Sequence, residues 1–145
     1  MNDFHKQDWK QRYETMGSPA EQAFLHAHPY AHRLGLDKPD FSMTKLPAFF
    51  RQAPDFMLSD GVYEVMGVSS GSDNPSLKMK HEKLDALLEW NKYGKVHLWV
   101  WDSATGSINC RPIKEWEALM VDYATIGHFP DNNKKYWDLP IHRFM

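Results

Sequence analysis

The stretch Ala53-Pro54-Asp55-Phe56-Met57-Leu58-Ser59-Asp60-Gly61-Val62-Tyr63-Glu64-Val65-Met66-Gly67 decides the fold of this chain. Two runs rich in apolar and β-branched residues flank Asp60-Gly61. That dipeptide suits a tight turn, because glycine tolerates a positive φ angle and aspartate does so better than most residues. The pattern therefore predicts a β-hairpin. With Asp60-Gly61 as a two-residue turn, counting outward places Leu58 opposite Tyr63.

This register separates an apolar face from an acidic one, since side chains alternate between the faces of a strand. The face expected to join the core carries Phe56, Leu58, Tyr63 and Val65, and the other face carries Asp55, Glu64 and Met66. On the second face Asp55 and Glu64 are diagonal neighbours, roughly 7 Å apart at the backbone. Two carboxylates on one sheet face are costly unless they are solvated or paired with a cation. Because Mg²⁺ prefers oxygen ligands, the hairpin predicts a divalent-metal site at Asp55 and Glu64.

The order Pro54-Asp55, Glu64, one intervening residue and a third site position resembles the PD-(D/E)xK nuclease superfamily. The longer string from Pro54 to Gly67 is similar to the core of phage-type junction-resolving endonucleases, in which a Pro-Asp-Phe strand runs through a turn into a Glu-x-Lys-Gly strand. The resemblance implies that Asp55 and Glu64 hold Mg²⁺ or Mn²⁺ with help from the backbone carbonyl of Val65. It also implies an α/β fold with a restriction-endonuclease-like αβββαβ core, a mixed sheet flanked by helices. The implied activity is metal-dependent hydrolysis of phosphodiester bonds in DNA, including branched or junction DNA.

The chain departs from that family at Met66, which stands where the family has lysine. A thioether carries no charge and donates no hydrogen bond. Some members of the superfamily carry the lysine on another element, and the periodicity of residues 76–90 predicts a helix with Lys80 on its apolar stripe. Lys80 is therefore the predicted replacement, with Lys78 second and His81 third. The alternative is that Lys80 extends its long stem to solvent from a purely structural position.

A helix is predicted to start at Ser18-Pro19, with Ser18 as N-cap and Glu21 three residues after it. Glu21 has two open interpretations. It can complete a capping box with Ser18, or it can supply the extra metal-site glutamate that the first helix often delivers in the family.

The remaining elements are expected in the following order. Residues 1–17 form a short helical arm, residues 45–51 a strand leading into the hairpin, residues 95–102 a central strand, and residues 113–125 a second amphipathic helix. A helix between the second hairpin strand and the strand at 95–102 permits a right-handed parallel crossover. The aromatic and basic tail at 131–144 either contacts nucleic acid or docks onto the core.

Composition indicates one globular domain over residues 1–145. Hydrophobic residues make up 42% and aromatic residues 14% of the chain, which argues against disorder. The formal net charge is −2, so any nucleic-acid surface must be a local basic patch supplemented by metal. A single cysteine, Cys110, excludes an internal disulfide and fits a reducing compartment. Because no apolar run approaches a membrane span and no signal peptide is expected, the predicted location is the cytoplasm, that of the host if a phage encodes the chain.

Two other functions stay open from the sequence. The first is a nuclease-fold module that binds nucleic acid or protein without cleavage, which the loss of lysine at Met66 favours. The second is a zinc hydrolase built on His26, His28 and His32, although no cysteine or second histidine cluster completes that set. A homodimer is expected only by analogy, because a DNA junction presents two equivalent strands.

Overall fold

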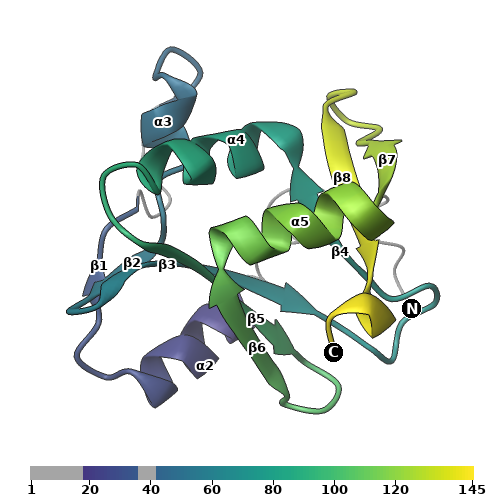
Figure 1. The fold of residues 1–145 in the computed structure, drawn as a ribbon, viewed down its shortest axis with the longest axis horizontal. Helices are drawn as coiled ribbons and strands as arrows, with labels where there is room; N and C mark the ends of the chain where they lie inside the picture. The colour runs from purple at the N-terminus through teal and green to yellow at the C-terminus, as the bar shows by residue number, and fades with distance from the viewer. Residues whose placement is uncertain (1–17, 36–41) are drawn as a thin grey trace.

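The computed structural model describes residues 18–35 and 42–145 (Figure 1). The helical arm predicted at residues 1–17 lies outside this part of the chain. The helices are α2 (Ser18–Ala27), α3 (Ala48–Arg51), α4 (His81–Trp90) and α5 (Ile113–Tyr123), followed by a 3₁₀ turn, η3 (Ile141–Arg143). One sheet has the order β1-β2-β3-β5-β6 and comprises β1 (His32–Arg33), β2 (Phe56–Leu58), β3 (Gly61–Val68), β5 (Val96–Asp102) and β6 (Ile108–Pro112). A second sheet has the order β4-β8-β7 and comprises β4 (Ser76–Lys80), β8 (Lys135–Pro140) and β7 (Thr125–His128).

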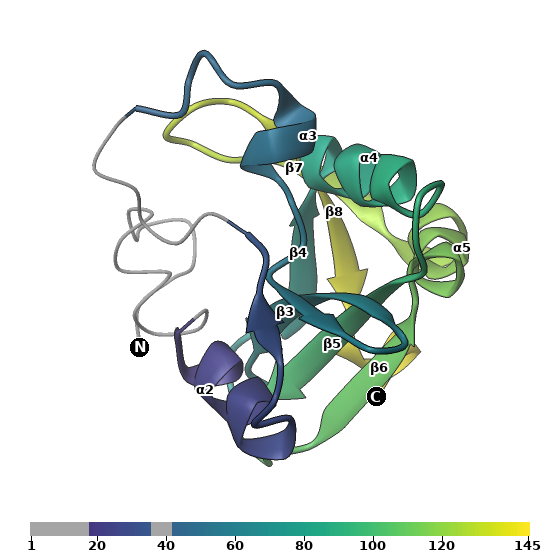
Figure 2. The ribbon, with the colours of Figure 1, turned by 90° about the vertical axis from the view of Figure 1, so that its left-hand side faces the viewer.

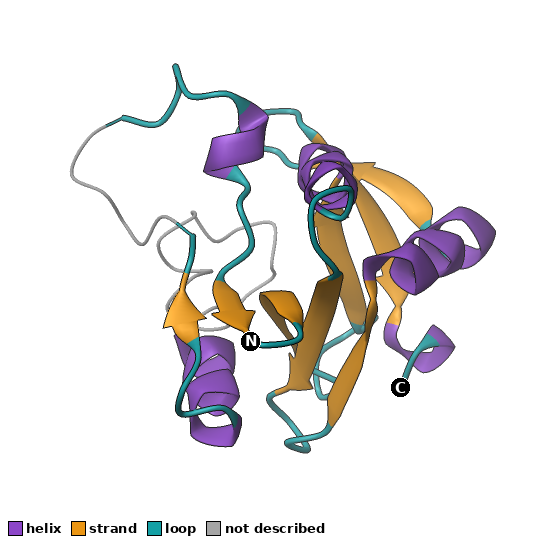
Figure 3. Cartoon of the chain, turned by 60° about the vertical axis from the view of Figure 1, so that its left-hand side comes forward, coloured by secondary structure: helices purple, strands orange, loops and turns teal. Residues whose placement is uncertain are grey.

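Helices cover both faces of the five-stranded sheet, so the predicted α/β class with a mixed sheet flanked by helices is confirmed. Helix α2 packs against β3 and β5 on one face, and α4 and α5 pack against β5 on the other (Figure 2). The edge view in Figure 3 shows the same separation of α2 from α4 and α5 by the strands. The described residues include no helix that is long and apolar enough to cross a membrane.

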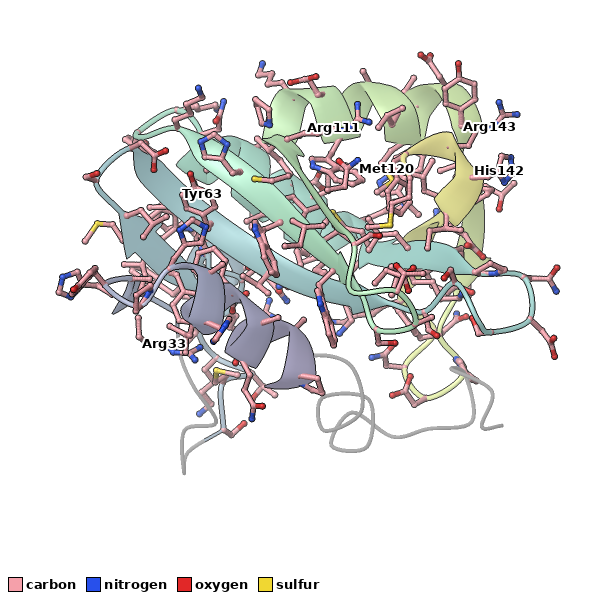
Figure 4. All side chains as sticks on the ribbon, turned by 90° about the horizontal axis from the view of Figure 1, so that it is seen from below. Arg33, Tyr63, Arg111, Met120, His142 and Arg143 are labelled. Atoms are coloured by element: carbon pink, nitrogen blue, oxygen red, sulfur yellow. The ribbon has the colours of Figure 1, made fainter. Side chains whose placement is uncertain are left out.

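Two core clusters follow from this layering. The smaller cluster, under α2, consists of Ala20, Phe24, Phe56, Tyr63, Val65 and Trp99. The larger cluster, under α4 and α5, includes Val68, Leu77, Met79, Leu84, Leu87, Leu98, Val100, Trp116, Met120 and Leu139. Met120 points from α5 into the layer between that helix and the sheet (Figure 4). Phe56, Tyr63 and Val65 therefore lie in a core, as predicted for that face of the hairpin.

The hairpin forms, but its turn is Ser59-Asp60 rather than Asp60-Gly61. Phe56 pairs with Tyr63 and Leu58 pairs with Gly61, which shifts the register by two residues from the prediction. Gly61 belongs to the strand because it lies against the backbone of Lys95: its φ is 151°, and a Cβ there would collide with the Lys95 carbonyl oxygen. A shift of two residues keeps every side chain on its predicted face, whereas a shift of one would have reversed them all.

The strand predicted at 95–102 is β5, and it runs parallel to β3 with Glu64 opposite Leu98. Helix α4 lies in the connection between the two strands, so the predicted parallel crossover is present. The helix predicted at 113–125 is α5, which ends at Tyr123.

Two predicted elements are wrong. The helix expected over 76–90 begins only at His81, because residues 76–80 form β4, which pairs with β8. Burial alternates along β4, with Leu77 and Met79 buried, so a period of two residues prevails there over the helical period. The strand expected over 45–51 is instead the short helix α3, which begins directly after Pro47.

The C-terminal tail at 131–144 docks onto the core, which was one of the two alternatives predicted for it. It forms β8 and η3, and its buried residues are Tyr136, Leu139, Ile141 and Phe144.

Candidate functional site

The hairpin brings the two predicted metal ligands, Asp55 and Glu64, together. Extending the observed register by one residue beyond Phe56 places Asp55 opposite Glu64, which is closer than the predicted diagonal arrangement. The backbone amide of Val65 donates a hydrogen bond of 2.9 Å to Oδ2 of Asp55. Each residue of a strand directs its N–H and C=O toward the same neighbour, so the carbonyl of Val65 faces the edge that holds Asp55.

Glu64 is a buried acid with one paired oxygen and one unpaired oxygen. Its exposed fraction is 2%. The Lys83 ammonium, from the first turn of α4, lies 2.6 Å from Oε2 of Glu64. The second oxygen, Oε1, has no hydrogen-bond partner among the described residues. A buried carboxylate oxygen without a partner is costly, so this atom is available to a cation.

Burial controls the protonation of this cluster. It raises the pKa of Asp55 well above its usual range, and the negative charge of Glu64 raises it further. Burial also raises the pKa of Glu64, although the Lys83 ammonium opposes this shift. Burial alone would lower the pKa of Lys83, but the charges of Glu64 and Asp55 outweigh it and raise that pKa. Lys83 therefore stays protonated at neutral pH.

These residues fit a hard divalent cation. Asp55, Glu64 and the carbonyl of Val65 offer oxygen ligands, and Mg²⁺ characteristically uses one or two carboxylates together with waters and substrate phosphates. Over residues 18–35 and 42–145, no group of three or more His, Cys, Asp or Glu side chains is arranged to hold a metal. Asp55 and Glu64 supply two carboxylates, a number that Mg²⁺ or Mn²⁺ accepts, whereas a structural zinc site takes four protein ligands.

Glu21 lies beside this cluster and is paired with Arg33. Its exposed fraction is 8%. The two terminal nitrogens of Arg33 each lie 3.3 Å from one oxygen of Glu21. The Arg33 guanidinium also lies 4.5 Å from the centroid of the Phe56 ring, at the side of α2 in Figure 4. The negative charge of Glu21 contributes to the raised pKa values of Asp55 and Glu64, so Glu21 is close enough to act on the site.

The predicted replacement lysine, Lys80, lies elsewhere. As the last residue of β4, it directs its ammonium over the ring of Phe129, 5.6 Å from the ring centroid. The second choice, Lys78, donates a hydrogen bond of 2.7 Å to Ser76. The third choice, His81, stacks on the ring of Trp137 with the centroids 4.5 Å apart.

Lys83 is the residue that sequence reasoning missed. The prediction started the helix at residue 76, so residues 76–80 helped to define its apolar face and placed Lys80 on it. Once the helix begins at His81, Lys83 precedes the fully buried Leu87 by one helical turn and must lie on the inward face. Met66 is partly buried and packs against the larger core.

Among the described residues, the three histidines of the zinc alternative belong to no group of three side chains that could hold a metal ion. His28 packs against the ring of Phe24, with centroids 4.8 Å apart, while His32 lies in β1. Comparison of the chain with protein-family models, with curated proteins and with solved structures finds no match.

Proposed function

We propose that this protein is a metal-dependent endonuclease that hydrolyses phosphodiester bonds in DNA. The observation that carries the proposal is the buried pair Asp55 and Glu64, with Oε1 of Glu64 unpaired and an ammonium 2.6 Å from Oε2. A buried acid pair with a raised pKa and one fixed cation is typical of a functional site rather than of a stable core. The observed order α2-β1-α3-β2-β3-β4-α4-β5 contains the αβββαβ order of the superfamily core with β1 and α3 inserted after the first helix, and β4 lies in the second sheet.

In this mechanism Asp55, Glu64 and the Val65 carbonyl would hold Mg²⁺ or Mn²⁺. Such an ion would supply positive charge to the phosphate and would make a nearby water easier to deprotonate. Lys83 supplies the ammonium that a lysine at the position of Met66 supplies in the superfamily. Because its pKa is raised, Lys83 acts as a hydrogen-bond donor and positive charge toward the phosphate or the attacking water, rather than as a base. The oxygen of water bonds to phosphorus, the bond to the leaving oxygen breaks, and a proton ends on that oxygen.

The second candidate function is a module of the same fold that binds nucleic acid or protein without cleavage. The position of Met66, packed against the larger core, favours it, because no ammonium can come from that position. The two functions differ in whether products form. Incubation of supercoiled plasmid and four-way junction DNA with Mg²⁺ or Mn²⁺ distinguishes them: products that vanish with a chelator support the enzyme, and binding without products supports the module.

Asp55→Ala is the decisive variant for the enzyme. It removes one of two metal carboxylates, so we expect cleavage to fall by at least roughly 100-fold. Asp122→Asn, at an exposed position on α5, is the matched control and should cleave like the unmodified protein. Undiminished cleavage by Asp55→Ala would remove the basis of the assignment.

Thermal unfolding of Asp55→Asn tests the metal site without activity. In the absence of metal this variant relieves the repulsion between two buried acids, so its melting temperature should rise by about 3 to 6 °C. Mg²⁺ should stabilise the unmodified protein and leave the variant unchanged. Equal stabilisation of both proteins by Mg²⁺ would show that the ion binds elsewhere.

A further inference from the structure

An aromatic pocket lies between α3 and α4, outside the acid cluster. It is an open surface pocket with a volume of about 540 Å³, lined by Phe49, Glu89, Trp90 and Tyr93. The rings of Phe49 and Trp90 stack almost parallel, with centroids 4.4 Å apart and 2° between their planes. Tyr93 meets Phe49 edge-on at 6.2 Å, and its exposed fraction is 76%. A large ring that is three-quarters exposed contributes little to the core, so burial does not account for Tyr93.

The polar groups of the pocket indicate a planar, uncharged ligand. The indole N–H of Trp90 already donates to the carbonyl of Phe49 at 2.8 Å and its ring is stacked on Phe49, so the ring that the pocket offers to a ligand is that of the exposed Tyr93. At the rim, Glu89 is paired with Lys92 at 2.8 Å, which leaves this edge without net charge. A neutral rim of this kind has no excess positive charge with which to hold a phosphate, whereas the ring faces suit a heterocycle that stacks.

The same two elements carry the pocket and the acid cluster. Trp90 follows Lys83 by seven residues, two helical turns on the same side of α4 and about 10 Å along its axis. Phe49 precedes Asp55 by six residues, through the short segment that joins α3 to β2. At about 3.4 Å per nucleotide, 10 Å corresponds to about three nucleotides of a stacked strand. A strand with its phosphate at Lys83 therefore has bases within reach of the pocket.

We infer that this pocket binds an unpaired nucleobase of the DNA substrate a few nucleotides from the cleaved phosphate. The inference rests on the proposed function and makes it more specific: the substrate must offer unpaired bases, as single strands and flaps do. Phe50, which is edge-on to Phe49 and 55% exposed, extends the aromatic surface beyond the pocket.

The test uses full-length Asp55→Ala protein, which on the proposed function is expected to bind DNA without cutting it. The probe is a flap oligonucleotide with 2-aminopurine at an unpaired position near the branch, and a fully paired duplex of the same sequence is the comparison. We expect 2-aminopurine fluorescence to be quenched on binding, and Tyr93→Ala to abolish the quenching and weaken flap binding roughly 10-fold while duplex affinity is unchanged. Tyr123→Ala is the matched control. Tyr123 is also an exposed aromatic residue, on α5, where the Arg143 guanidinium lies 4.3 Å from the centroid of its ring.

Flap binding and quenching that persist in both Tyr93→Ala and Phe50→Ala would overturn the inference. It would equally fall if those variants turned a dimer into a monomer in sedimentation while DNA binding stayed the same, since the pocket would then serve a second copy of the chain. Chelator-sensitive cleavage by the unmodified protein is scored separately. If the unmodified protein never cleaves DNA but quenching depends on Tyr93, the result supports the base pocket and contradicts the nuclease proposal.

Discussion

At the scale of single residues, Lys83 and Glu64 stabilise each other and hold the charge balance of the acid cluster. Glu64 is almost fully buried, and the Lys83 ammonium lies 2.6 Å from Oε2 of its carboxylate. The ammonium also offsets part of the repulsion from Asp55. Lys83 therefore contributes to folding and, in the proposed mechanism, to catalysis.

Lys83→Met should separate these contributions. It leaves Glu64 buried without a counter-charge, so we expect the free energy of unfolding to fall by about 3 kcal/mol, measured by urea denaturation. Cleavage should fall by at least roughly 100-fold, because a charged donor near the phosphate is lost. The double variant Lys83→Met with Glu64→Gln should regain stability but not cleavage.

Lys80→Ala is the matched comparison for that experiment, since Lys80 lies over Phe129 rather than at Glu64. Its cleavage rate should stay within about twofold of the unmodified protein's, as expected for a position outside the reacting groups. If Lys80→Ala abolished cleavage and Lys83→Met did not, the sequence-based choice would be right and the assignment to Lys83 wrong.

At the scale of secondary-structure elements, the hairpin depends on the contact between Gly61 and the backbone of Lys95. Val62 donates its backbone N–H to the Lys95 carbonyl at 2.9 Å, which fixes the start of β3 against the residue before β5. There is no room for a Cβ at Gly61.

Gly61→Ala should therefore disturb the register that places Asp55 opposite Glu64. We expect a loss of about 2 kcal/mol in the free energy of unfolding, because the φ angle and the Lys95 carbonyl both oppose a side chain. Gly94→Ala is the control, since nothing lies within 4 Å of a Cβ built there, and it should be neutral or stabilising by about 0.5 kcal/mol. Equal midpoints in urea for the two variants would contradict the importance of this contact.

The hairpin also shows how far the sequence could be interpreted. Alternation of side chains predicted which residues face the core and which face the site, and the structure agrees for Phe56 and Tyr63. The turn itself was misplaced because Asp60-Gly61 satisfies local turn preferences, while the position of Gly61 is set by Lys95, more than 30 residues away. Local pattern therefore predicted the faces, and a distant contact fixed the register.

The choice of lysine failed for a related reason. Residues 76–80 alternate in burial because they pair with β8, near the end of the chain. The sequence alone does not show the pairing with β8, and Leu77 fits the apolar face of a helix with Leu84 equally well. Lys83 became recognisable only when the strand was separated from the helix.

At the scale of the whole molecule, Glu82 joins three parts of the chain that are distant in sequence. It forms ion pairs with Arg51 of α3 and with Lys134, which lies just before β8 and is 3.0 Å from Oε2 of Glu82. Glu82 lies in the first turn of α4, directly before Lys83. These pairs tie α3 and the β7–β8 connection to the helix that delivers the site lysine.

Glu82→Gln should show what this tie contributes. Burial raises the pKa of Glu82, but the hydrogen bond and charge of Lys134 and the charge of Arg51 outweigh it, so the net pKa is lowered from its usual 4.5. A lowered pKa in the folded state means stability that is present above pH 4.5 and is lost as the pH falls through the folded value. At pH 7 we expect the variant to lose about 1 kcal/mol in urea denaturation, and this difference should shrink below pH 4.5 and in high salt.

Glu89→Gln is the control for that measurement, because its pair with Lys92 is exposed and joins residues of neighbouring turns only. It should change the free energy of unfolding by less than about 0.5 kcal/mol at any pH. If both variants lowered the free energy of unfolding equally, the ion pairs of Glu82 would contribute no more than an ordinary surface pair. The position of α4 over the site would then depend on packing in the larger core alone. The alternative result is a loss of stability that occurs only in Glu82→Gln and that disappears as Glu82 is protonated. It would show that the ion pairs of Glu82 with Arg51 and Lys134 help to hold Lys83 in position.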